Sequence, residues 1–124
     1  MKTLKILLLL LIFFNTAHAN ESFKLKKIIA LSNPWGLSFI NDEEIIISEK
    51  EGEILLVNIK DGSKKNIKHN LGYKVDGQGG LLEILKYQDY IYICYTEDRG
   101  DGKTSTSIAK AKFSKTNLNF KNIF

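Results

Sequence analysis

Short apolar segments alternate with polar, turn-forming segments along most of this chain. Residues 44–48 contain three consecutive isoleucines, as expected for a strand buried on both faces. Residues 90–96 alternate aromatic and aliphatic side chains, and no segment after residue 19 has a convincing helical period. The pattern therefore predicts an all-β protein. The predicted strands are 35–40, 44–48, 53–59, 64–69, 80–85, 90–96 and 104–113, with the start of another at 117–124.

The strand pattern repeats once. Gly36-Leu37 and Gly80-Leu81 lie 44 residues apart, and each pair opens a strand, a turn and a second strand rich in isoleucine. Four short strands that recur every 40–50 residues are typical of a β-propeller blade. A β-sandwich, whose strands recur every 8–12 residues, is the alternative.

The length of the chain limits the propeller interpretation. A propeller closes with about four to eight blades, and this chain holds material for roughly two. Two blades leave apolar faces and strand edges uncovered. We therefore expect an N-terminal portion of a larger propeller, partnered by the remaining blades or, failing these, by self-association.

The N-terminus predicts export. Lys2 and Lys5 precede an unbroken apolar run at 6–14, and Ala17 and Ala19 mark a small-x-small cleavage site. The run is about half the roughly 20 residues that a membrane span needs. Residues 1–19 are thus predicted to be a signal peptide. Residues 20–124 are predicted to form the mature periplasmic or secreted domain, with no membrane attachment after cleavage.

Charge and cysteine content exclude other classes. The formal net charge is +4, and it falls to +2 without the two signal-peptide lysines. The remaining lysines are dispersed, which argues against nucleic-acid binding. Cys94 is the only cysteine, so no intramolecular disulfide is possible, and its apolar neighbours predict a buried strand thiol.

One glycine-rich turn is the candidate site. The segment Val75-Asp76-Gly77-Gln78-Gly79-Gly80-Leu81-Leu82 has three glycines in four positions and leads into an apolar strand. Glycines permit positive φ and close backbone approach to a ligand. Gln78 offers an amide with two donors and an acceptor. The segment is typical of a ligand-binding loop, although ordinary glycine turns are also common.

Several of these segments resemble a known family. Asn33-Pro34-Trp35-Gly36-Leu37-Ser38-Phe39, Ile45-Ile46-Ile47-Ser48-Glu49 and Gly52-Glu53-Ile54 are similar to the opening blade of the soluble quinoprotein glucose and sorbosone dehydrogenases, with the aldose sugar dehydrogenase branch the most alike. Gly77-Gln78-Gly79-Gly80-Leu81-Leu82 resembles the family's Gly-Gln-Gly-Gly-Leu-Leu, the most specific of these motifs.

The resemblance implies a six-bladed propeller that binds pyrroloquinoline quinone (PQQ) and calcium and oxidises aldoses in the periplasm. In the family, a histidine takes the proton of the C1 hydroxyl while hydride passes to the quinone, and the cofactor supplies the redox chemistry. The Gln of the glycine-rich loop lies beside the sugar, so the resemblance assigns substrate binding to Gln78.

The same comparison places the catalytic base and most PQQ and calcium ligands beyond this chain. His69 carries no family motif and is expected to be a surface histidine. Trp35 has the chemistry of a sugar-stacking platform, but its place at a strand start favours packing between blades. The acidic segment 97–102 is expected to be an exposed turn rather than a calcium site. We expect the chain to be inactive by itself. The alternative is a non-catalytic propeller or sandwich that binds carbohydrate or protein.

Overall fold

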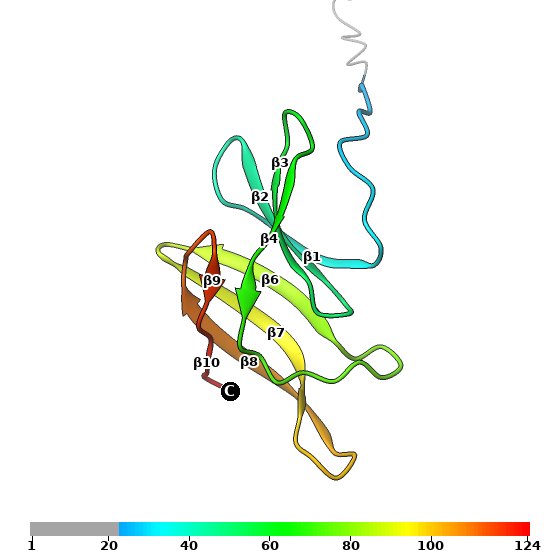
Figure 1. Ribbon diagram of the computed structural model, residues 1–124, viewed down its shortest axis with the longest axis vertical. Helices are drawn as coiled ribbons and strands as arrows, with labels where there is room; N and C mark the ends of the chain where they lie inside the picture. Colours follow the sequence, from blue (N-terminus) through cyan, green and yellow to red (C-terminus); the bar gives the residue numbers. More distant parts are fainter. Residues whose placement is uncertain (1–22) are drawn as a thin grey trace, which may run out of the picture.

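The computed structural model describes residues 23–124, so the predicted signal peptide lies outside the described residues. Strands and turns make up this part of the chain, which confirms the all-β prediction for it (Figure 1). None of its segments forms a helix long and apolar enough to cross a membrane. The strands are β1 Pro34–Phe39, β2 Glu44–Glu49, β3 Ile54–Asn58, β4 Lys64–Asn66, β5 Lys68–His69, β6 Leu81–Tyr87, β7 Tyr90–Asp98, β8 Thr104–Lys112, β9 Asn117–Leu118 and β10 Lys121–Asn122.

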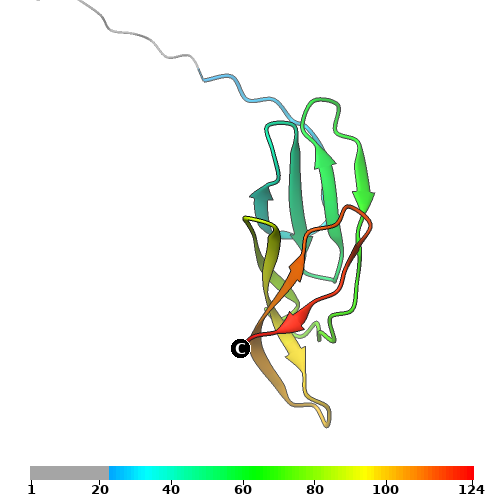
Figure 2. The ribbon, with the colours of Figure 1, turned by 90° about the vertical axis from the view of Figure 1, so that its left-hand side faces the viewer.

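Two four-stranded antiparallel sheets form the molecule. The first sheet has the order β1-β2-β3-β4, and the second has the order β10-β8-β7-β6. Figures 1 and 2 show the two sheets one beyond the other along the long axis, with β5 and β9 beside their junction. β5 and β9 pair in parallel as a small third sheet. Each large sheet is an up-and-down meander of the kind found in propeller blades.

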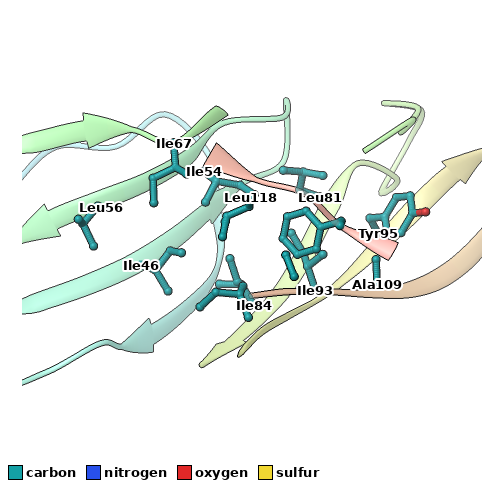
Figure 3. Packing of buried hydrophobic residues seen from close by; sticks show 13 residues of the cluster. Ile46, Ile54, Leu56, Ile67, Leu81, Ile84, Ile93, Tyr95, Ala109 and Leu118 are labelled. Atoms are coloured by element: carbon teal, nitrogen blue, oxygen red, sulfur yellow. The ribbon is translucent and has the colours of Figure 1, made fainter. Parts of the chain in front are cut away.

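The main hydrophobic core lies between the two large sheets (Figure 3). Ile46 and Ile54 of the first sheet face Ile84 and Ile93 of the second, and each of these side chains is at most 1% exposed. Burial of such aliphatic side chains contributes about 1.5–3 kcal/mol each. The core therefore joins the sheets into one folded unit.

The opposite face of the first sheet carries a second apolar cluster. Ile45 and Ile47 belong to this cluster, whereas Ile46 between them faces the main core. Ile29 and Leu31, which precede β1, pack over the cluster. This arrangement confirms that the isoleucine-rich strand is buried on both faces, and successive side chains of a strand point to opposite faces.

The strands β1 and β6 approach closely where the sheets meet. A Cβ atom added to Gly36 would lie 2.6 Å from the Ile84 nitrogen. The Ser48 hydroxyl donates to the Leu82 carbonyl at 2.5 Å, and the Lys86 N–H donates to Ser38 Oγ at 2.9 Å. Glycine is therefore required at position 36 for this contact between the sheets.

One strand prediction needs correction. The single outer strand expected at 64–69 is divided into β4 and β5, because Ile67 between them is fully buried and directs the chain away from the edge of the first sheet. The strand expected to begin in the segment 117–124 is confirmed, because β9 and β10 lie there. The first of these pairs with β5, and the second completes the second sheet next to β8.

One side-chain prediction is also wrong. Cys94 is only half-buried, because its neighbours Ile93 and Tyr95 occupy the core face of β7 and direct Cys94 to the other face. Trp35 does not pack between these two sheets, so its expected packing between blades stays a prediction for contact with a further blade. Its side chain is 41% exposed, because Gly36 rather than Trp35 occupies the contact with β6.

Substitution of Gly36 by alanine should destabilise the fold by about 1–3 kcal/mol, since the added methyl group collides with the β6 backbone. Gly72→Ala is the matched control, because a Cβ at Gly72 meets no atom within 4 Å. We expect the control to change the free energy of unfolding by no more than about 0.5 kcal/mol. Urea denaturation measures both variants, and equal stabilities would contradict the proposed steric role of Gly36.

The purified chain should self-associate. Leu85, Tyr87 and Tyr90 point away from the main core and are 53%, 58% and 36% exposed, and Ile123 and Phe124 at the end of the chain are also exposed. Exposed apolar patches favour association. Sedimentation velocity should show oligomers at high concentration that Leu85→Lys reduces and Val75→Lys, in a loop, does not. A monomer at all concentrations would contradict this expectation.

Candidate functional site

The glycine-rich loop is anchored at both ends by one residue of β7. The Lys74 N–H donates to the Thr96 carbonyl at 2.9 Å, and the Thr96 N–H donates to the Gly80 carbonyl at 2.8 Å. A Cβ on Gly79 would lie 3.0 Å from Thr96 Oγ1, so the loop also packs tightly against this side chain. Thr96 thus closes the base of the loop, and residues 75–79 project beyond it.

Lys50, in the turn after β2, provides the second anchor. Its carbonyl accepts the Leu81 N–H at 3.0 Å, and its ammonium group donates to the Gly77 carbonyl. Gly80 has φ +148°, and a Cβ there would lie 2.2 Å from the Lys50 oxygen. The sequence therefore needs glycine at position 80 for both conformation and space. Lys50 therefore connects the first sheet to the loop that precedes β6 of the second sheet.

Gln78 lies at the exposed part of this loop. The Gly79 N–H donates to the Asp76 carbonyl at 2.6 Å, and Gly77 has φ +53°, so a tight turn surrounds the glutamine. Within residues 23–124, the Gln78 side chain is exposed and makes no hydrogen bond. The loop backbone is fixed while the amide is free. This is the arrangement expected of a ligand-binding side chain, although the role itself stays a prediction.

His69 has a structural environment. Its Nε2 lies 2.8 Å from the Gly52 carbonyl, and its Nδ1 accepts the Leu71 N–H at 3.3 Å. Nδ1 must be unprotonated to accept, so Nε2 carries the proton and donates to Gly52. The histidine is half-buried rather than at the open surface that we expected. Both ring nitrogens are occupied by backbone groups, which leaves neither free to act as a base.

The acidic segment 97–102 forms the end of a hairpin, as expected. The Glu97 carboxylate accepts hydrogen bonds from Ser107 and Asn122 and pairs with Arg99 at 2.8 Å. The Tyr95 hydroxyl donates to Asn122, and burial followed by the nearby Glu97 charge raises the pKa of Tyr95. In residues 23–124, no three His, Cys, Asp or Glu side chains gather to hold a metal ion. These polar groups therefore tie β10 to the second sheet.

A buried carboxylate that the sequence analysis missed lies at the end of β2. Glu49 is 3% exposed and accepts the N–H groups of Ser32 and Asn33 at 2.6 and 3.3 Å. Burial opposes its ionisation, but these hydrogen bonds prevail and lower the pKa of Glu49. The hydrogen bond with Glu49, followed by desolvation, raises the pKa of Glu53. The only signal in the sequence was a glutamate directly after a buried strand.

A comparison with known protein families identifies one that the chain matches. The family described as Glucose / Sorbosone dehydrogenase matches residues 31–124, which include both sheets and the glycine-rich loop. The chain belongs to this family. A comparison with curated protein sequences found no significant match.

Solved structures of this glucose/sorbosone dehydrogenase family share the fold. A glucose dehydrogenase is 30% identical, with a TM-score of 0.70 over 76% of this chain and 32% of its own. The apo-form of the soluble aldose sugar dehydrogenase from Escherichia coli is 25% identical, with a TM-score of 0.68 over 76% and 30%. The PQQ-bound aldose sugar dehydrogenase from Streptomyces coelicolor is 21% identical, with a TM-score of 0.69 over 81% and 32%. The chain spans about a third of the length of these proteins.

The residues of this glucose/sorbosone dehydrogenase family member do not by themselves form a site for the cofactors implied by the family. Within 23–124, no acidic cluster is available for calcium. PQQ carries three carboxylates, and the one ammonium group bonded to the loop, that of Lys50, already contacts the Gly77 carbonyl. The described residues therefore supply at most one edge of a cofactor site, and no reaction step is assigned to either group here.

Glu49→Gln should lower the free energy of unfolding by about 1–3 kcal/mol at pH 7, because two backbone N–H groups lose a charged acceptor. The pKa of Glu49 is lowered by folding, so its contribution is present above the ordinary value of 4.5 and is lost as the pH falls through the folded-state pKa. Denaturation at pH 7 and pH 3 should therefore show a larger difference at pH 7.

Glu53→Gln is the control for this variant. The pKa of Glu53 is raised beside Glu49, so removal of its charge at pH 7 relieves repulsion and should leave stability unchanged or slightly higher. A loss of stability equal to that of Glu49→Gln would show that the two carboxylates are equivalent and would contradict the assigned anchor.

Proposed function

We propose that this chain is the N-terminal portion of an exported, PQQ-dependent aldose dehydrogenase with a six-bladed propeller, in which Gln78 binds the sugar substrate. The observation that carries this proposal is the free amide of Gln78 on an anchored glycine loop, in a chain whose residues 31–124 match the glucose/sorbosone dehydrogenase family. The two four-stranded sheets would be the first two blades. Calcium and PQQ would be bound mainly by residues outside this chain.

The proposed role of Gln78 follows from the chemistry of its amide. A sugar hydroxyl is both a donor and an acceptor, and the amide offers a carbonyl oxygen and two N–H donors in one plane. Thr96 and Lys50 fix the loop backbone before the ligand arrives. A fixed loop loses less conformational freedom on binding, so more of the interaction energy contributes to affinity. Gln78 would orient the sugar for oxidation at C1.

The location proposed for this function is the periplasm or the cell exterior. The sequence of residues 1–19 has the charged, apolar and small-residue regions of a signal peptide. The structural relatives include a soluble aldose sugar dehydrogenase. A periplasmic position gives the protein access to free sugars, its proposed substrates.

The alternative function is non-catalytic binding of carbohydrate or protein. One observation favours it for this chain alone, because both ring nitrogens of His69, the only histidine in residues 23–124, contact backbone groups. A chain whose described histidine is occupied in this way should bind sugar without the histidine-assisted oxidation of the family. We therefore expect no aldose oxidation by residues 20–124 when PQQ and calcium are added.

The substitution Gln78→Ala tests the proposed function in a protein that contains this chain and the rest of a propeller. Loss of the amide should raise KM and lower kcat/KM for aldose oxidation about tenfold or more, because a substrate hydroxyl loses its partner. Stability should be unchanged, since the Gln78 side chain makes no hydrogen bond within residues 23–124. Steady-state kinetics and thermal denaturation measure the two effects.

Gln88→Asn is the control variant, because Gln88 is also a glutamine in an exposed turn but lies outside the glycine-rich loop. Gln88 has φ +49°, a conformation that asparagine tolerates, and it lies at the turn between β6 and β7. Its substitution should leave kcat/KM unchanged. An unchanged kcat/KM for Gln78→Ala would remove Gln78 from the substrate site.

A further inference from the structure

Three consecutive backbone carbonyls in the turn between β2 and β3, those of residues 50–52, accept hydrogen bonds from the segments that flank the glycine-rich loop. Leu81, directly after the loop, donates its N–H to the first carbonyl at 3.0 Å. Tyr73, before the loop, donates its hydroxyl to the second at 2.9 Å. His69 donates its Nε2–H to the third at 2.8 Å. Both ends of the loop are therefore held on one turn of the first sheet.

Tyr73 reaches this turn from a backbone that is fixed to the second sheet. It forms an isolated β-bridge with Glu97 of β7. On either side of it, the Gly72 carbonyl accepts the Asp98 N–H at 3.0 Å, and the Lys74 N–H donates to a carbonyl of β7 at 2.9 Å. The half-buried ring of Tyr73 packs against the main core. Tyr73 thus links the second sheet, through its backbone, to the first sheet, through its hydroxyl.

The shape of the turn depends on this tyrosine. Gly52 has φ +115°, a conformation that other residues rarely adopt, and a Cβ there would overlap the Tyr73 ring. Glycine itself has little preference for one backbone conformation. The peptide group between Glu51 and Gly52 is therefore oriented by its hydrogen bonds. Its N–H donates to the Glu49 carbonyl at 3.0 Å, and its carbonyl accepts the Tyr73 hydroxyl.

The orientation of the turn in its own right affects the loop that carries Gln78. Lys50 directly precedes Glu51, and it binds the loop twice, through its carbonyl at the end of the loop and through its ammonium group at the Gly77 carbonyl. Gly77 is the residue before Gln78. A rotation of the backbone at Glu51 would displace both Lys50 contacts and, through them, the loop backbone at Gln78.

We propose that Tyr73 is a positioning residue for the sugar site, which holds the turn 50–52 so that the loop presents the Gln78 amide in one orientation. The inference rests on the proposed function for the ligand of Gln78, whereas the positioning of the loop is a property of the chain itself. A loop that is held in place before binding loses less conformational freedom, which favours affinity. Because the hydrogen bond to Glu51 is exposed to solvent, its loss should affect the loop more than the whole fold.

Amide hydrogen exchange of the purified chain, followed by NMR, tests the positioning without substrate. The variant is Tyr73→Phe, which keeps the ring and removes only the hydroxyl. We expect the hydrogen-bonded N–H groups of Gly79 and Leu81, at the end of the loop, to exchange about fivefold faster in this variant. The N–H of Phe113, which is hydrogen-bonded to the turn at the opposite end of β6, should keep its rate.

Tyr95→Phe is the matched control for the exchange measurement. It also removes one hydroxyl hydrogen bond, which joins Tyr95 to Asn122 at 2.8 Å and does not involve the turn 50–52. The two loop amides should exchange in this variant as they do in the unaltered chain. Unchanged rates at the loop amides in Tyr73→Phe, or an equal acceleration at Phe113, would overturn the proposal, since the hydroxyl would then have no local effect on the loop.

A double-mutant cycle connects Tyr73 to Gln78, in a protein that contains this chain and the rest of a propeller. Tyr73→Phe should raise KM for an aldose about threefold and leave kcat unchanged, because the substitution weakens binding and alters no reacting group. In the Gln78→Ala background, Tyr73→Phe should raise KM no further, since the amide that it positions is absent.

The cycle also separates this inference from the proposed function. An equal increase of KM by Tyr73→Phe in both backgrounds would show that Tyr73 does not act through Gln78, and it would overturn the positioning role. If Gln78→Ala alone leaves KM unchanged, the proposed function fails, and the exchange rates of the loop amides still decide whether Tyr73 positions the loop.

Discussion

The close approach of β1 and β6 is the constraint on which the rest of the structure depends. Each sheet is an antiparallel meander that leaves apolar side chains uncovered, and a main core forms only when the two sheets meet. Gly36 permits the contact, and Ser48 and Ser38 satisfy backbone groups of β6 across the junction. Apolar burial supplies the favourable free energy, whereas these polar contacts fix the relative position of the sheets. A chain unable to make this contact would retain strand propensity without a shared core.

The same junction positions the candidate site. Lys50 follows β2 in the first sheet, yet its carbonyl and ammonium group bind Leu81 and Gly77 at the start of the second. Thr96 completes the anchorage from within the second sheet. The loop geometry consequently depends on the position of one sheet relative to the other. Changes in the core would reach Gln78 through these backbone hydrogen bonds, without any contact to its side chain.

Much of the fold could be predicted from the sequence because local pattern determines it. The consecutive isoleucines of β2 and the alternating aromatic and aliphatic residues of β7 each predicted a strand. The recurrence of Gly-Leu predicted the repeated unit. Predictions failed where contacts between distant segments determine the bounds of a strand or the burial of a side chain. Ile67 interrupts a polar strand because the core accepts its side chain, and Cys94 is only half-buried because Ile93 and Tyr95 occupy the core face of β7. The loop was evident from its glycines, but its anchors, Thr96 and Lys50, come from distant segments and have no local signature.

The contrast between Gln78 and His69 supports the proposal that this chain binds the substrate and does not supply the catalytic base. His69 has the chemistry of a base, but Gly52 and Leu71 occupy both nitrogens, and protonation of Nδ1 would abolish its bond to Leu71. Gln78 cannot transfer protons at neutral pH, but its amide is free and its backbone is fixed. The free amide thus belongs to a hydrogen-bonding side chain, whereas the one histidine in the described part of the chain serves the fold. Under the proposed function, Gln78 would hold and orient the sugar, and a base and a redox cofactor held mainly by residues outside this chain would carry out the oxidation.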